Sequence, residues 1–122
     1  MKYLVDSNII IYHLNHDPIA TTFLSENYEE IAISQITFIE VLSFSFSKKA
    51  EKDVRELLST FDIIDVTKEV SNQAVENRRI KKIKIPDNII ASTAMVHNLI
   101  LVTRNVKDFK VLDVEVLNIF DK

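Results

Sequence analysis

Five polar residues are spaced along this sequence in a way that suits metal chemistry. Each lies just after a predicted strand or within the first turns of a predicted helix, and they are Asp6, Glu40, Asp87, Asn105 and Asp108. Mg²⁺ and Mn²⁺ prefer oxygen ligands from carboxylates, amides and water. Two or three carboxylates can hold such an ion and leave positions for a phosphate and an activated water. If the fold gathers these residues, the pattern predicts a site for hydrolysis of a phosphodiester.

Glu40 poses the sharpest question, because it lies inside the apolar helical segment ITFIEVLSF, residues 36–44. An ionised carboxylate is rarely buried unless it is paired, bound to metal or protonated. On a helix, Glu40 shares one face with Thr37, Ser43 and Ser47. This polar stripe faces either open water or a metal cleft, and the pattern alone leaves both readings open.

The other polar residues also have structural explanations. Asp6 suits the cap of a following helix, and Asp87 suits the first turn of another. Asn105 and Asp108 are common turn residues. What favours a site is that all of these positions fall at the ends of predicted elements.

The elements that position these residues alternate between strands and helices. Predicted strands cover 2–5, 31–34, 62–66, 99–103 and 114–119. Predicted helices cover 9–14, 19–30, 35–46, 50–61, a segment from 67 into the basic run near 80, and 87–98. Ser34 is the predicted N-cap of the helix that carries Glu40, and Asn98 is a predicted left-handed helix terminator.

Continuous apolar strands that alternate with helices indicate a parallel sheet covered on both faces. Such sheets bind ligands at the carboxyl ends of their strands, where the strand order reverses. If the first and fourth strands are neighbours, Asp6 and Asn105 lie side by side at that edge. Glu40 and Asp87, at the starts of helices, would then join them.

The composition fits one α/β domain over residues 1–122, with 47% apolar residues and no cysteine. The opening MKYLVDSN lacks the apolar run of a secretory signal, and we expect a cytoplasmic protein without membrane segments. The formal net charge of −3 argues against a general nucleic-acid coat. It does not argue against a nuclease, because bound divalent ions reverse the local potential of an acidic site.

Positive charge is concentrated in RRIKKIK, residues 78–84. Its cations are Arg78, Arg79, Lys81, Lys82 and Lys84, and Arg104 follows the fourth predicted strand. The run suits either the solvated C-terminal end of a helix or a surface that contacts phosphates. We interpret these six residues as candidate RNA contacts, and both readings of the run can hold together.

Three segments resemble the motifs of one nuclease family. LVDSNIIIYHL is similar to the opening motif of PIN-domain nucleases, and SQITFIEVL to their second motif, with Glu40 in the acidic place. IPDNIIASTAMVHNLILVTRNVKDF resembles their next helix, strand and turn. The order and spacing cover essentially the whole chain and are most similar to the VapC-type toxins of toxin–antitoxin pairs.

The resemblance implies a three-layer α/β/α fold around a parallel five-stranded sheet with its first strand central. It implies an endoribonuclease dependent on Mg²⁺ or Mn²⁺, with Asp6, Glu40 and Asp87 as acidic site residues. The fourth position differs, since Asn105 stands where many relatives have an acid. We expect Asn105 as a metal ligand and Asp108 as a catalytic residue acting through a water.

The same resemblance implies an RNA substrate such as tRNA, a cognate antitoxin protein as partner, and a homodimer.

Two other classes of protein are alternatives to a nuclease. A PIN-fold binding module with weak or no catalysis would explain the missing fourth acid. A phosphoacceptor receiver domain would instead show paired acids after its first strand, where this chain has Asp6, Ser7 and Asn8.

Overall fold

Five parallel strands form one sheet in this computed structural model, which describes residues 1–121. The strands are β1 (Tyr3–Val5), β2 (Ile31–Ser34), β3 (Asp62–Ile64), β4 (Ile100–Val102) and β5 (Val116–Leu117). Their order is β3-β2-β1-β4-β5, and each neighbouring pair is parallel. This confirms the predicted five-stranded parallel sheet with the first strand central and β4 beside it.

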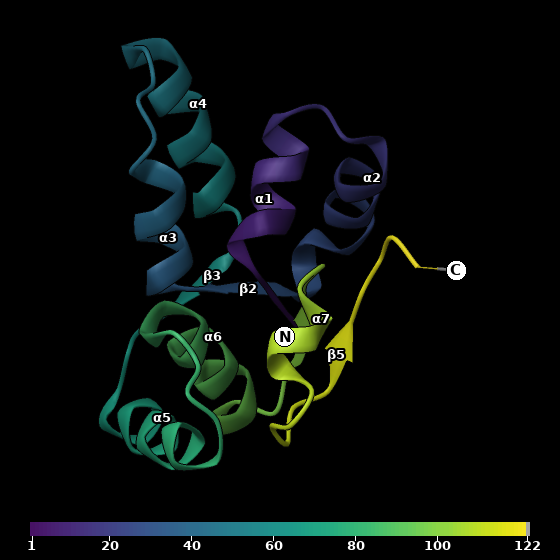
Figure 1. The fold of residues 1–122 in the computed structure, drawn as a ribbon. Coiled ribbons are helices and arrows are strands. Elements are labelled where there is room, and N and C mark those ends of the chain that lie inside the picture. The colour runs from purple at the N-terminus through teal and green to yellow at the C-terminus, as the bar shows by residue number, and fades with distance from the viewer. Residues whose placement is uncertain (122) are drawn as a thin grey trace.

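Helices cover both faces of the sheet and complete the predicted three layers. They are α1 (Ser7–Leu14), α2 (Pro18–Asn27), α3 (Gln35–Leu42), α4 (Lys48–Ser59), α5 (Lys68–Ile80), α6 (Ile85–Val96), α7 (Val106–Phe109) and the 3₁₀ turn η1 (Tyr28–Glu30). In Figure 1, α1 and α2 lie above the sheet and α5 and α6 below it. Across residues 1–121, every helix falls short of the length and apolarity that crossing a bilayer demands.

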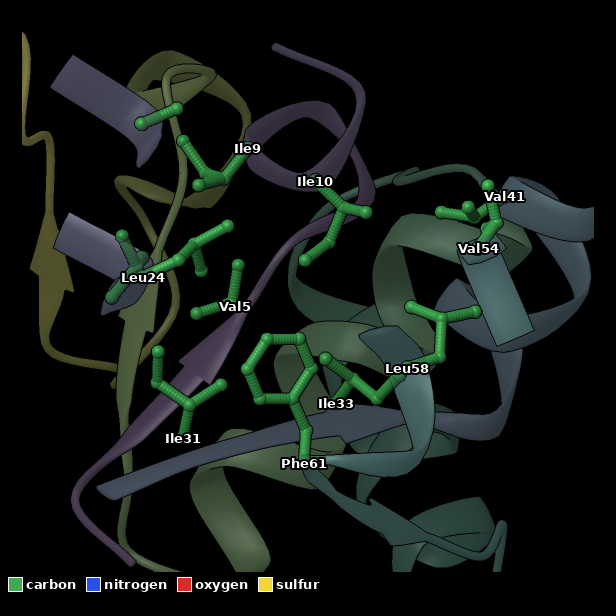
Figure 2. Close-up of a cluster of buried hydrophobic side chains, with 12 residues drawn as sticks. Val5, Ile9, Ile10, Leu24, Ile31, Ile33, Val41, Val54, Leu58 and Phe61 are labelled. Atoms are coloured by element: carbon green, nitrogen blue, oxygen red, sulfur yellow. The ribbon is translucent and has the colours of Figure 1, made fainter. Parts of the chain in front are cut away.

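Two apolar clusters hold the layers together, one on each face of the sheet. Successive residues of a strand point to opposite faces, so Val5 enters one cluster and Leu4 the other. Figure 2 shows Val5, Ile33 and Leu58 converging in the first cluster. The second cluster joins Leu4 to Ile90 of α6. Each such burial contributes about 1.5–3 kcal/mol, so both helical layers are needed for stability.

The helix that carries Glu40 is shorter than predicted, because α3 ends at Leu42. The Ser43 hydroxyl donates to the carbonyl of Ile39 at 2.6 Å, and serine in such a position competes with the helical ladder. Ser47 then caps α4 by accepting a hydrogen bond from a backbone N–H of its first turn. The serines that interrupt this apolar segment therefore separate two helices.

Three other boundaries depend on local chemistry. Ser34 caps α3 and Asn98 adopts a φ of 57° just beyond α6, as predicted. α6 begins at Ile85 and includes Pro86, earlier than predicted, because a proline N–H is not needed in the first helical turn. The short helix α7 forms where the sequence indicated only a turn.

The strand order reverses at β1. From β1 the chain adds β2 and β3 on one side, and then β4 and β5 on the other. The backbone N–H of Asp6 donates to the carbonyl of Val102 at 2.9 Å, which joins the carboxyl ends of β1 and β4. This is the crevice position at which open α/β sheets bind ligands.

Candidate functional site

Asp6 is the most buried of the acidic side chains at the carboxyl edge of the sheet. It follows β1 and caps α1, and its Oδ1 accepts the backbone N–H of Ser7 at 2.7 Å. Its Oδ2 accepts the hydroxyl of Thr103 at 2.7 Å, from the end of β4. Asp6 is only 5% exposed and Thr103 is fully buried. Asp6 is therefore a helix cap and a fixed, buried carboxylate at once.

The pKa of Asp6 is raised from 3.8 to about 6, mainly by burial and to a smaller extent by the charges of Asp87 and Glu40. The hydrogen bonds from Thr103 and Ser7 lower this pKa but do not offset the increase. The three carboxyl groups therefore share one region of the edge, although they come from β1, α3 and α6. Bringing their negative charges together is unfavourable until a cation joins them.

Glu40 points toward the start of α1. Its Oε1 accepts the hydroxyl of Ser7 at 2.6 Å, and the same hydroxyl lies 3.2 Å from Thr37 Oγ1. Thr37 is fully buried and Glu40 is half-buried. Ser43, on the same predicted stripe, is exposed. The stripe is thus interior at the end nearest Asp6, which favours the cleft reading of Glu40.

Asp87 lies in the first turn of α6 and completes the group. Burial raises its pKa, the charges of Glu40 and Asp108 raise it further, and Lys84 lowers it. Asp108, on α7, accepts a hydrogen bond at Oδ2 from the side-chain amide of Asn105 at 2.6 Å. Asn105 and Asp108 therefore form one unit beside Asp87, with Asp108 half-buried and Asn105 exposed.

The donor chemistry of this edge fits a hard divalent cation, because it consists of carboxylate and amide oxygens. No ion pair within residues 1–121 neutralises Asp6 or Asp87, which leaves the negative charge uncompensated. Across the same residues, no three acidic, histidine or cysteine side chains are close enough to hold an ion as they stand. Glu40 and Asp108 instead bond to Ser7 and Asn105. A cation at this edge would therefore need the carboxyl groups to move closer together than they stand.

A shell of polar side chains that the sequence did not single out holds the acids. Ser7 links Asp6 to Glu40, and Thr103 also accepts from the Asn8 amide at 3.2 Å and the Asn105 backbone N–H at 3.0 Å. The Asn8 Oδ1 is buried and has no hydrogen-bond partner within residues 1–121. Thr103 had a readable signal, because it ends the strand predicted to lie beside the first.

Two lysines of the basic run reach the acidic edge, which is the carboxyl edge of the sheet with Asp6, Glu40, Asp87, Asn105 and Asp108. Lys84 directly precedes α6 and acts on the charge of Asp87. The Lys81 Nζ donates to the backbone carbonyl of Asp108 at 3.1 Å and to that of Lys107 at 3.4 Å. The basic run and the acidic edge are therefore adjacent.

Arg104 lies at the same edge, directly after Thr103. Its guanidinium carbon is 4.6 Å from the ring centroid of Phe120 and 5.3 Å from that of Tyr12. The two rings are themselves in edge-to-face contact at 5.2 Å. Such cation–π contacts hold an arginine in place and leave its N–H edges to contact a phosphate.

The remaining cations of the run have different surroundings. Arg78 donates to the carbonyl of Ile83 at 3.1 Å, which fixes the turn after α5. Arg79 pairs with Glu76 at 3.0 Å, and both side chains are highly exposed. Lys82 is exposed and has no side-chain hydrogen bond or ion pair within residues 1–121.

The fold and its acidic edge together define the class. The PIN domain family matches residues 3–115, and this chain belongs to that family. The match spans nearly all the described elements, including every side chain of the acidic edge. The family resemblance of the three sequence motifs is thereby confirmed.

Full-length relatives narrow the comparison. The chain is 35% identical to the Ribonuclease VapC2 of Rickettsia felis, with 100% of both proteins covered. Among solved structures, a toxin–antitoxin complex from Klebsiella pneumoniae matches with a TM-score of 0.88 and 35% identity, covering 99% of this chain and 100% of that one. VapBC2 from Rickettsia felis, bound to a promoter DNA fragment, matches with a TM-score of 0.83 and 30% identity, covering 97% of this chain and 98% of that one.

Proposed function

We propose that this chain is a metal-dependent endoribonuclease that cleaves structured RNA, tRNA in particular, as the toxin of a toxin–antitoxin pair. The observation that carries the proposal is the set of mutually repelling carboxyl groups of Asp6, Glu40 and Asp87 at the carboxyl edge of the sheet. The relative named a ribonuclease and the similar toxin–antitoxin complex support the activity and the biological role.

In this proposal Asp6, Glu40, Asp87 and Asn105 hold Mg²⁺ or Mn²⁺. The bound ion supplies Lewis acidity, which stabilises charge on the phosphate and makes a water more nucleophilic. The hydroxyls of Ser7 and Thr103 keep the carboxylates of Glu40 and Asp6 oriented.

In this proposal Asp108 takes up the proton of the attacking water. Its Oδ2 accepts from Asn105, which leaves Oδ1 to accept a proton from the attacking water. The water oxygen would form a bond to phosphorus as the bond between phosphorus and the 3′ oxygen on the opposite side breaks. The departing 3′ oxygen would take a proton from solvent water, which leaves a 5′-phosphate on one fragment and a 3′-hydroxyl on the other.

The RNA backbone would lie across the exposed cations next to the acidic edge. Lys82, Lys84 and Arg104 are exposed there, and phosphate contacts of this kind make binding dependent on salt. Structured RNA is read largely by shape and by its single-stranded loops. An acidic chain with a local basic patch therefore suits a selective ribonuclease better than a general RNA coat.

The activity is tested with purified, antitoxin-free protein and total tRNA. We expect discrete cleavage products in Mg²⁺ or Mn²⁺, none in EDTA, and fragments whose new ends carry a 5′-phosphate. A circular-dichroism spectrum shows that the EDTA sample is still folded. Absence of cleavage by folded protein with either metal, on tRNA and on total RNA, would contradict the proposal and favour the catalytically inactive PIN-fold binding module.

A homodimer and an antitoxin complex are also part of the proposal. Of the aromatic residues near the α3–α4 hairpin, Phe61 is buried and Phe38 and Phe46 pack partly on the first cluster. Phe44 is 53% exposed and Ile39 is 56% exposed. Exposed apolar side chains of this size on one hairpin are typical of an interface.

We expect static light scattering to give the mass of a dimer at high protein concentration. Phe44→Ser should shift the equilibrium toward monomer, because it removes apolar contact area without touching the sheet. Val111→Ser is the matched control, since Val111 is equally exposed, at 58%, on the loop before β5. A monomer at every concentration would contradict the dimer, and equal shifts in both variants would remove the hairpin from the interface.

A further inference from the structure

Lys81 connects two segments of the chain that lie far apart in sequence. It follows α5, and its half-buried side chain reaches the backbone carbonyls of Lys107 and Asp108 on α7. The backbone N–H of Lys81 also donates to the carbonyl of Asn77 at the end of α5. Lys81 is therefore held at both ends, its backbone by α5 and its ammonium group by α7.

α7 needs such support because it has only four residues. A helix this short is unstable alone, and the carbonyl of Lys107 accepts only a long hydrogen bond from the backbone N–H of Lys110, at 3.4 Å, among residues 1–121 apart from that of Lys81. A lysine ammonium satisfies such carbonyls and suits the negative end of the helix dipole. The N-terminal side of α7 is tied separately, since the backbone N–H of Asn105 donates to Thr103.

The position of α7 matters because it carries Asp108. The carboxylate of Asp108 is held by Asn105, and its charge acts on Asp87. A rotation of α7 would move Asp108 and Asn105 together, away from the other carboxylates. The anchoring of the last turn of α7 thus controls where Asn105 and Asp108 lie at the acidic edge.

We propose that Lys81 is a positioning residue, whose hydrogen bonds to the carbonyls of Lys107 and Asp108 hold Asn105 and Asp108 toward Asp87. Two of the three N–H donors of Lys81 are used in this way. Of the two adjacent lysines, we therefore assign the phosphate contact to Lys82, which is exposed. The inference rests on the proposed function only in naming Mg²⁺ or Mn²⁺ as the ion that the edge binds.

Adjacent lysines provide a matched test, Lys81→Met against Lys82→Met. Each substitution removes one positive charge beside the same acidic edge, so electrostatics alone would tighten the binding of Mn²⁺ in both. We expect the opposite for Lys81→Met, with roughly tenfold weaker Mn²⁺ binding, the scale found when a partner of a metal ligand is lost. Lys82→Met should bind Mn²⁺ at least as well as wild type. Electron paramagnetic resonance of unbound Mn²⁺ measures both.

Hydrogen exchange of the metal-free proteins tests the anchoring directly. We expect the amides of residues 105–110 to exchange several-fold faster in Lys81→Met, with the amides of β1 and α6 unchanged. Lys81→Arg, which keeps charge and donors, should restore both slow exchange and Mn²⁺ affinity. RNA binding by Lys82→Met should show a shallower salt dependence than wild type, whereas Lys81→Met should keep the wild-type slope.

Each result separates the inference from the proposed function. Tightened Mn²⁺ binding in Lys81→Met, or unchanged exchange of residues 105–110, would overturn the positioning role. Faster exchange across the whole protein would also overturn it, since Lys81 would then support the fold in general. If wild-type protein binds no Mn²⁺, the proposed function fails, while the exchange experiment still decides whether Lys81 anchors α7.

Discussion

Asp6→Asn and Glu40→Gln should each reduce metal-dependent cleavage of tRNA by at least about a thousandfold, the scale expected when a group that acts in the transition state is lost. Each substitution keeps the size of the side chain and removes one negative charge from the edge. Asn is also a good helix cap, so α1 should still form after Asp6→Asn. Single-turnover cleavage of labelled tRNA in Mn²⁺ measures the loss.

The control for this experiment is Asp113→Asn, an exposed carboxylate on the loop before β5. It changes the net charge by the same amount, so it should cleave at the wild-type rate. Cleavage that survives in Asp6→Asn or in Glu40→Gln would contradict the assignment of that residue. Survival in both would remove the acidic edge from the reaction, even if the protein is a ribonuclease.

The second large effect concerns stability: the substitution Asp6→Asn, which should greatly reduce activity, should stabilise the metal-free protein. Folding raises the pKa of Asp6 from 3.8 to about 6, so the folded protein binds this proton more tightly than the unfolded chain does. The stability of the metal-free protein should therefore fall as the pH rises from about 4 to above 6, by about 3 kcal/mol when converted at 1.36 kcal/mol per pH unit. Asp6→Asn removes this titration.

In EDTA at pH 7.5, we expect Asp6→Asn to be more stable than wild type by about 1–3 kcal/mol, with the difference fading near pH 4. Urea unfolding at both pH values measures it. Adding Mn²⁺ should stabilise wild type, because the ion binds only the folded form, and should do little for the variant. An Asp6→Asn protein that is less stable than wild type at pH 7.5 would mean that the hydrogen bonds from Ser7 and Thr103 outweigh the burial of the charge.

Together these two results would describe a trade between activity and stability. The ionised carboxylate of Asp6, which the proposed reaction requires, also lowers the stability of the metal-free protein. The half-buried Asp87 belongs to the same group, since Glu40 and Asp108 act on its charge. Metal binding would remove the repulsion at both positions.

The layers of the fold and the edge that holds the site could be predicted from sequence, because they depend on local signals. Apolar runs such as IAIS, residues 31–34, mark strands buried on both faces, and Ser34 marks a helix start. Parallel pairing then places every strand end at one edge. The positions of Asp6, Glu40 and Asp87 follow from that rule without any knowledge of their contacts.

The details that failed depend on contacts between distant segments. The carbonyls of α7 accept hydrogen bonds from Lys81 and its Phe109 is buried, and neither contact is visible in TRNVKDF itself. The early end of α3 is an exception, because it accompanies a local hydrogen bond from Ser43 to the carbonyl of Ile39. The roles of Ser7 and Thr103 also required the fold, since their partners come from other elements.

The basic run illustrates the same limit. Arg78, Arg79, Lys81 and Lys82 are nearly consecutive and chemically similar, so composition treats them as one patch. The structure gives them different surroundings: a backbone carbonyl for Arg78, a glutamate for Arg79 and the end of α7 for Lys81. These residues are therefore distinguished by the partners that the fold gives each side chain.

The pairing of β1 with β4 has a consequence for when the protein becomes active. The hydroxyl of Thr103 bonds to Asp6 although the two residues are separated by 97 positions in sequence, and Asp108 comes later still. A chain on the ribosome with only β1, β2 and β3 outside the exit tunnel lacks Asp87, Asn105 and Asp108. If the acidic edge is the active site, we expect the protein to become a competent nuclease only after residues 103–108 have left the tunnel and Thr103 has reached Asp6.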